Sequence, residues 1–147
     1  MTLRAMSGRT KAESVDDLAT WLQKLSGCPT VNHTMTATCA NPSHDEPATW
    51  FYVEADRAEG VARMRCLSCG MVRSLLDSQE RWTYPSAWAC LECSQSIAEV
   101  AFGMHLEEDS SVSWVAMGVR CVECGDLTGV ADFVVHAGDV DEVAAAL

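Results

Sequence analysis

The sequence predicts a small β-rich α+β protein made of two similar modules in tandem, each an antiparallel sheet of three to four strands. Six of the eight cysteines stand in Cys-x-x-Cys pairs. Runs of alternating apolar residues, which are typical of half-buried strands, lie beside these pairs. Both halves follow one plan: a cysteine-containing turn, a strand, a turn, a strand, Cys-x-x-Cys-Gly and a further strand. A repeated plan with little residue identity indicates a duplicated architecture.

Two helices complete the expected fold. Ser14 is the expected N-cap of an N-terminal helix with apolar residues at helical spacing, and Gly27 is its expected stop. Asp139 is the expected N-cap of a short C-terminal helix, with Glu142 at the capping-box position. The expected parts are a flexible tail (1–13), an amphipathic helix (14–27), a first module with its linker (28–89), and a second module with the C-terminal helix (90–147).

The expected strands of the first module cover residues 34–38, 49–54, 61–65 and 71–76, and those of the second cover 97–107, 112–120 and 127–135. In the second module, alternate residues of the first strand form one apolar face, namely Val100, Phe102, Met104 and Leu106. Val115, Met117 and Val119 form the facing row on the next strand. Gly129 marks an expected bulge in the third strand.

Four cysteines of the second module predict a structural zinc site: Cys90, Cys93, Cys121 and Cys124. Four thiolates close a tetrahedral set and leave no open position, which suits a structural Zn²⁺. A glycine after the second cysteine, as at Gly125, permits the left-handed turn that such a pair needs. No iron–sulfur spacing is present.

The first module predicts a second zinc ion, held by Cys39, His44, Cys66 and Cys69. Asn41-Pro42-Ser43 supplies turn chemistry between the first two of these ligands. Cys28 and His33 form an alternative pair with the same Cys-x4-His spacing, and the choice between the two pairs stays open. The lone histidines His105 and His136 are expected to be surface or satisfied residues rather than ligands.

The ligand spacing and strand pattern of residues 34–136 resemble the zinc ribbons of transcription factors, RNA polymerase subunits and small adaptor proteins. The resemblance implies tandem zinc ribbons with two structural Zn²⁺ ions. Because zinc ribbons bind DNA, RNA or proteins, or brace a fold, the resemblance indicates structure more firmly than function.

Charge and hydropathy restrict the partners. Residues 1–89 hold ten acidic and nine basic side chains, whereas residues 90–147 hold eleven acidic side chains and one basic one, Arg120. Such a surface repels phosphate backbones and favours a basic protein partner. No apolar run is long enough to span a membrane, and the first residues have no secretory pattern. We therefore expect a cytoplasmic protein. Eight cysteines in an unsecreted chain indicate metal binding rather than disulfides.

Three functions are weighed. The first is a non-enzymatic protein-interaction or regulatory module, for example one associated with transcription. The second is nucleic-acid binding through arginines beside the aromatic residues 50–52, namely Arg57, Arg63, Arg65 and Arg73. Against the second, pairing of these arginines with Glu54, Asp56 and Glu59 would leave an ordinary solvated face.

The third function is a zinc-dependent hydrolase. His44, Glu46 and the Cys66/Cys69 pair resemble the pattern of zinc deaminases, which implies zinc on His44, Cys66 and Cys69 with Glu46 as general acid and base. The chain departs from that pattern. Arg65 stands where proline is expected, the gap is shorter, no flanking helices are predicted, and Cys39 is available as a fourth ligand. We therefore expect no enzyme activity.

Overall fold

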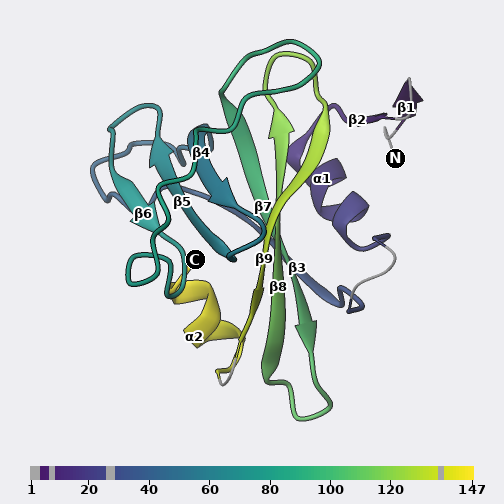
Figure 1. The fold of residues 1–147 in the computed structure, drawn as a ribbon, viewed down its shortest axis with the longest axis vertical. Helices are drawn as coiled ribbons and strands as arrows, with labels where there is room; N and C mark the ends of the chain where they lie inside the picture. The colour runs from purple at the N-terminus through teal and green to yellow at the C-terminus, as the bar shows by residue number, and fades with distance from the viewer. Residues whose placement is uncertain (1–3, 7–8, 26–28, 136–137) are drawn as a thin grey trace.

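The computed structural model describes residues 4–6, 9–25, 29–135 and 138–147. Within them lies a seven-stranded antiparallel sheet with two short helices and a separate two-stranded hairpin (Figure 1). The elements in chain order are β1 (Arg4–Met6), β2 (Arg9–Lys11), α1 (Val15–Leu22), β3 (His33–Thr36), β4 (Phe51–Asp56), β5 (Val61–Cys66), β6 (Val72–Ser74), β7 (Ala98–Leu106), β8 (Val112–Cys121), β9 (Leu127–Val134) and α2 (Val140–Ala145).

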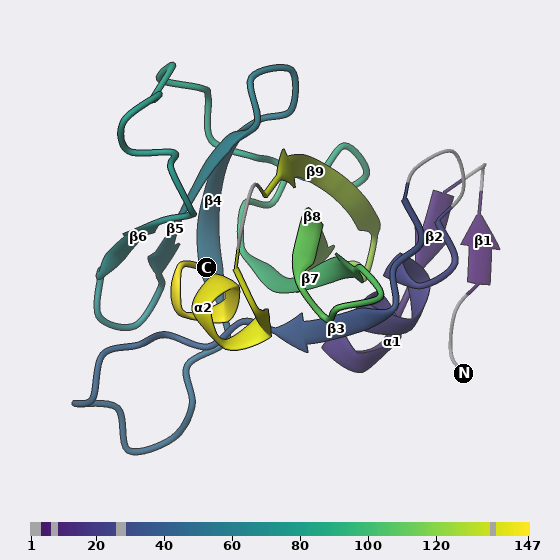
Figure 2. The ribbon, with the colours of Figure 1, turned by 90° about the horizontal axis from the view of Figure 1, so that it is seen from below.

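The strands of both halves share one sheet. Its order is β6-β5-β4-β7-β8-β9, and β3 also pairs with β7. The two halves meet at the centre of the sheet, where β4 and β7 pair at Phe51 and Ala98. The sheet curls strongly, so that β9 returns to contact β4 and β5 (Figure 2). The expected tandem ribbons are therefore not confirmed as two separate sheets.

Alternate side chains of the curled sheet point inward and form the main core. Val100, Phe102 and Met104 of β7 face Val115, Met117 and Val119 of β8, as the alternation predicts, and all six are buried. Burying such side chains contributes about 1.5–3 kcal/mol each, so this interior supplies much of the driving force for folding. The expected bulge is also present, since β9 carries one extra residue between Gly129 and Ala131 opposite Met117 and Gly118.

Helix α1 lies on the opposite face of β7 and β8. The Oγ atom of Ser14 accepts a hydrogen bond from the Asp17 N–H (3.3 Å), so the predicted N-cap is confirmed. Leu18 and Leu22 are fully buried against the strands, where Gly103 and Gly118 carry no side chain. A Cβ atom at Gly118 would lie 3.1 Å from both leucines. The missing side chains therefore let the helix approach the sheet closely.

Helix α1 ends at Leu22, earlier than expected. The next N–H groups, of Lys24 and Leu25, bond three residues back to Trp21 and Leu22, so the last turn tightens. The predicted stop at Gly27 lies outside the described residues. At the C-terminus the prediction holds, because Asp139 Oδ1 accepts from the Glu142 N–H (2.9 Å) and begins α2.

Two local arrangements differ from the expected modules. Strand β3 comes from the first half but pairs with β7 of the second half over Ala101–Met104. Residues within the expected tail form the β1–β2 hairpin, and Ala12 beyond it donates its N–H to the Gly125 carbonyl (2.8 Å). Both arrangements tie the N-terminal segment to the second half through long-range contacts that local periodicity does not encode.

Candidate metal centres

The second module brings its four predicted cysteines together at one end of the β7–β8 pair. Cys90 and Cys93 precede β7, Cys121 ends β8, and Cys124 follows it. Their four sulfur atoms all lie within 4.8 Å of one another. Because the register of β7 and β8 pairs Ala98 with Cys121, the hairpin itself fixes the spacing between the two cysteine turns.

The distances in this cluster match a tetrahedral zinc site. Cys90 Sγ lies 3.6 Å from Cys124 Sγ, and Cys93 Sγ lies 3.5 Å from Cys121 Sγ. Zinc–sulfur bonds of about 2.3 Å at tetrahedral angles place two sulfur atoms about 3.8 Å apart. A disulfide would need about 2.05 Å. The four thiols therefore fit a zinc ion and are not positioned as disulfides.

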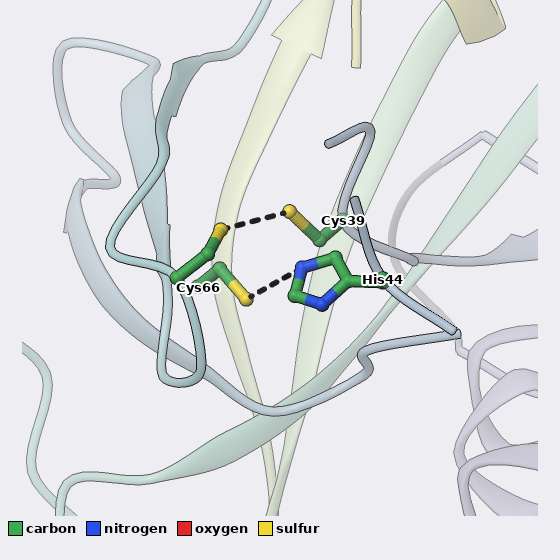
Figure 3. Close-up of side chains that lie close together, drawn as sticks. Cys39, His44 and Cys66 are labelled. Carbon is green, nitrogen blue, oxygen red and sulfur yellow. Dashed lines mark hydrogen bonds between the residues drawn. The ribbon is translucent and has the colours of Figure 1, made fainter. Parts of the chain in front are cut away.

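The first cluster has three sulfur atoms and one imidazole. Cys39 and His44 lie in the loop after β3, while Cys66 ends β5 and Cys69 follows it, and their donor atoms all lie within 4.8 Å of one another. Figure 3 shows Cys39, His44 and Cys66 pointing toward one another. The Cys39–Cys69 sulfur distance is 3.6 Å, and the distance from Cys66 Sγ to His44 Nε2 is also 3.6 Å. Tetrahedral zinc with a Zn–N bond of about 2.05 Å predicts about 3.6 Å for such a sulfur–nitrogen pair.

Three cysteine turns share one hydrogen-bond pattern. In each, the first cysteine accepts at its carbonyl from the N–H four residues on, and its own N–H donates to the carbonyl five residues on. The residue after the second cysteine has a positive φ in all three turns: Gly70 (+76°), Ser94 (+66°) and Gly125 (+79°). The glycines were expected there. A serine was not expected at position 94, because serine rarely adopts a backbone conformation with positive φ.

The first site is the more exposed one. Cys69 is exposed and Cys39 and His44 are half-buried, whereas Cys90 and Cys121 of the second site are both buried. The Met71 N–H, donated to Cys69 Sγ over 3.4 Å, is the main reason that the pKa of Cys69 falls from 9.0 to about 6, and the Asn41 side chain adds to this. Burial raises the pKa of Cys39, and raises that of Cys121 from 9.0 to about 12. Metal binding requires the thiolate form, so the metal must overcome the cost of ionising the buried thiols.

The alternative ligand pair is not brought to the first site in the part of the chain described. His33 lies on β3, where it pairs with Met104, and Cys28 lies outside the described residues. Sequence reasoning also missed Asp126, a fully buried carboxylate with its Oδ2 4.0 Å from Cys90 Sγ. Its position two residues after Cys124 gives no pattern that could have identified it.

The four candidate arginines do not form one basic surface. Arg63 makes two hydrogen bonds to Glu54 (2.9 and 3.3 Å) and lies 4.2 Å over the Trp82 ring. Arg73 donates to the Ala145 carbonyl of α2, and Arg57 donates to the Gly129 carbonyl (3.4 Å). Arg65 is exposed on β5. Pairing with Glu54 was expected for this group, and it is found for Arg63.

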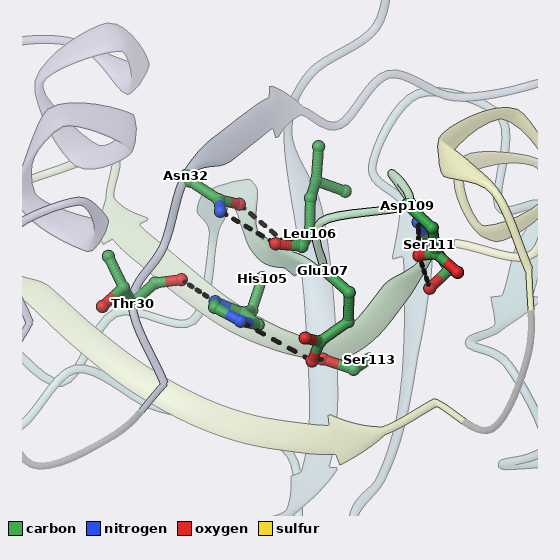
Figure 4. A network of polar contacts seen from close by, with 8 residues as sticks. All are labelled: Thr30, Asn32, His105, Leu106, Glu107, Asp109, Ser111 and Ser113. Atoms are coloured by element: carbon green, nitrogen blue, oxygen red, sulfur yellow. Dashed lines mark hydrogen bonds and ion pairs between the residues drawn. The ribbon is translucent and has the colours of Figure 1, made fainter.

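A polar network at the far end of the β7–β8 hairpin contains serine, histidine and glutamate (Figure 4). His105 Nδ1 lies 2.7 Å from the Thr30 carbonyl, and its Nε2 lies 3.7 Å from Glu107. Ser113 donates its hydroxyl to Glu107 (2.7 Å), so the histidine is not placed as a base for this serine. His105 is therefore a satisfied residue, as expected, and His136 lies outside the described residues.

The same network anchors the segment before β3. The Asn32 side chain accepts from the Leu106 N–H (2.7 Å) and donates to the Leu106 carbonyl (3.1 Å), as a paired strand residue would. These contacts hold β3 against β7 at the end of the sheet opposite the second metal site.

Among the described residues, no helix is long and apolar enough to cross a membrane. No protein-family model matches this chain, and neither a curated protein nor a solved structure is significantly similar to it.

Proposed function

We propose that this chain is a non-enzymatic zinc-binding protein whose two zinc ions stabilise the fold, and that it acts as a protein-interaction or regulatory module. The single observation that carries the proposal is the completeness of both ligand sets. Cys39, His44, Cys66 and Cys69 would hold one zinc ion, and Cys90, Cys93, Cys121 and Cys124 would hold the other. Zinc bound in this way supplies cross-linking between strands and loops far apart in the sequence.

The first site supports a structural role more than a catalytic one. A zinc hydrolase needs a position for water beside three protein ligands. Cys39 takes that fourth position, with its sulfur 3.6 Å from Cys69 Sγ. Glu46, the candidate acid and base, is exposed in the loop after His44. We therefore infer that the deaminase-like pattern is incidental.

Charge supports a protein partner over nucleic acid. The chain has a formal net charge of −11. Because three or four thiolates would outweigh the charge of one Zn²⁺ ion, neither zinc site would make the net charge more positive. A phosphate backbone would be repelled over most of the surface. Three of the four candidate arginines also donate to groups within the chain, namely Arg57, Arg63 and Arg73. Nucleic-acid binding remains the second candidate, and it rests on Arg65 and the aromatic residues beside it.

The test is native mass spectrometry of the tagged protein, purified from its own cells without chelator. The expected result is two zinc ions per chain and a co-purifying protein. Cys66→Ser and Cys121→Ser are matched variants, and each is expected to lower the stoichiometry to one zinc ion. Co-purifying nucleic acid, or activity that depends on zinc at the first site, would contradict the proposal.

A further inference from the structure

The outward face of β4, β5 and β6 carries exposed apolar side chains around one arginine. Trp50, Tyr52 and Val72 are 46%, 40% and 44% exposed, which is unusual for side chains of this size in a sheet. The register pairs Tyr52 with Arg65 and Arg65 with Val72, so these three residues form one cross-strand row. Trp50 lies two residues before Tyr52 and therefore shares its face. We call these four residues the outer face.

The rest of this side of the sheet is already covered. The next row pairs Glu54 with Arg63, and the Trp82 ring lies over the Arg63 guanidinium. Beyond Trp50 the surface is hollowed by a cavity of about 250 Å³, lined by residues 47–50 and by Leu67 and Ser68. The uncovered part thus runs from the row of Tyr52, Arg65 and Val72 toward the first metal site.

Strand β6 also directs backbone groups away from β5 beside this face. Past Ser74 this edge meets the C-terminal segment, where the Leu76 N–H donates to the Ala146 carbonyl (2.7 Å). The Cys66 N–H donates to the Met71 carbonyl (2.9 Å), and the Leu75 N–H donates to the Ala62 carbonyl (3.0 Å). Because hydrogen-bonded pairs alternate in an antiparallel ladder, the backbone groups of Val72 and Ser74 point away from β5. No other described strand pairs with this edge, which lies at the outside of the sheet (Figure 2).

Charge determines what fits on the outer face. Within the described part of the chain, Arg65 has no ion pair or hydrogen bond to a carboxylate, unlike Arg63 and Arg81, which pair with Glu54 and Asp77. An exposed guanidinium between Tyr52 and Val72 is complementary to a carboxylate flanked by apolar side chains.

We propose that the outer face and the free edge of β6 bind an extended segment of a partner protein that carries an acidic residue between apolar ones. The segment adds a strand beside β6, with its backbone bonded to Val72 and Ser74. The side chain opposite Val72 carries the carboxylate and reaches across Val72 to Arg65 on the next strand. The apolar side chains two positions away lie on the same face of the added strand, along β6. This inference rests on the proposed function and specifies its binding surface.

The test uses the zinc-loaded full chain and a display library of random peptides. The expected binders carry an acidic residue with apolar residues two positions away on either side. Arg65→Glu should weaken these peptides about fivefold or more. Peptides in which lysine replaces the acidic residue should regain affinity for the Arg65→Glu protein. Arg57→Glu is the matched control, because Arg57 is an exposed arginine in the β4–β5 turn and off the outer face.

Amide NMR locates the bound peptide. Binding should shift the Val72 and Ser74 amides and the Arg65 guanidinium signal, and should slow hydrogen exchange at the two amides. Peptides that bind Arg65→Glu equally well, or that shift other surfaces, would overturn the inference. So would a dimer formed through β6, or oligothymidylate that displaces the peptides from the outer face.

The two proposals fail in different ways. If the chain co-purifies with a protein that Arg65→Glu retains in full, the outer face is not the binding surface, and the interaction function stands. If two zinc ions are present and no protein co-purifies, the proposed function itself fails. Zinc stoichiometry is measured for each variant, so a loss of binding through unfolding is recognised as such.

Discussion

Gly125 lies directly against Ala12, and a Cβ atom at Gly125 would come within 2.4 Å of the Ala12 carbonyl oxygen. The Ala12 N–H donates to the Gly125 carbonyl (2.8 Å), and Arg120 Nε donates to the Ala12 carbonyl (2.9 Å). The turn of the second candidate metal site is thus also the docking point of the N-terminal segment. Gly125 belongs both to this cysteine turn and to the tertiary contact with Ala12.

Gly125→Ala should therefore destabilise the protein more than Gly70→Ala. Both glycines follow the second cysteine of a metal turn with nearly equal φ, +79° and +76°. Each alanine costs about 1–2 kcal/mol for the left-handed conformation. Only at Gly125 must backbone also move, since nothing lies within 4 Å of a Cβ atom at Gly70. Chemical denaturation of the two zinc-loaded variants measures the difference. Equal losses in the free energy of unfolding would mean that the close contact with Ala12 adds nothing to the cost of Gly125→Ala.

Much of the candidate site could be predicted because its pattern is local. A Cys-x-x-Cys turn is defined within six residues, so six of the eight candidate ligands follow from local spacing. Cys39 and His44 were preferred over Cys28 and His33, which have the same Cys-x4-His spacing, and that choice stayed open. The alternating strands β7 and β8 were predicted for the same reason. Pairing between distant segments has no such signal. Residues 34–38 predict a strand, yet nothing in them specifies β7 as the partner of β3.

Features that depend on three-dimensional contacts could not be predicted. The fully buried Asp126 lies beside Cys90, which is 36 residues earlier in the chain. Ser94 occupies a left-handed position for which glycine would be expected, so the residue type did not predict the backbone conformation at this position. Docking of Ala12 on Gly125 joins two segments whose compositions give no sign of contact.

Gly103→Ala should loosen the packing of α1 and the segment before β3. A Cβ atom at Gly103 would lie 2.9 Å from Val31 Cγ1, on the face that α1 covers. Overpacking of this kind costs about 1–3 kcal/mol. Gly129→Ala is the control, because nothing lies within 4 Å of a Cβ atom there. The free energy of unfolding, measured by urea titration, should fall only for Gly103→Ala. An equal fall for both variants would attribute the loss to strand conformation rather than to packing.

The two zinc ions should be released in a fixed order. A chelator reaches the first site more easily, because Cys69 is exposed there and Cys90 and Cys121 are buried in the second site. We expect two phases of zinc release, observed with a chromogenic chelator. His44→Ala should remove the fast phase and leave the slow one. Loss of the slow phase in that variant would show that the two sites unfold together. Cys121→Ser, which should remove the slow phase, is the reciprocal control.

Cys69 should be more reactive than Cys39 once the first site has lost its zinc and the second site has kept its zinc. Its pKa is lowered from 9.0 to about 6 by the Met71 N–H, whereas burial raises the pKa of Cys39 above 9.0. Because the folded-state pKa is the lower one, ionised Cys69 contributes stability that is fully present above about pH 9. That contribution is lost as the pH falls through 6.

Alkylation by iodoacetamide, mapped by mass spectrometry, measures this ionisation directly. Modification of Cys69 should rise around pH 6, well below the pH at which Cys39 reacts. Asn41→Ala should shift the Cys69 profile to higher pH, because the Asn41 side chain also stabilises the thiolate. Met71 contributes through its backbone, so Met71→Leu is the control and should leave the profile unchanged. A common profile for Cys69 and Cys39 would indicate that the loop opens when zinc leaves, so that the Met71 N–H no longer reaches the sulfur.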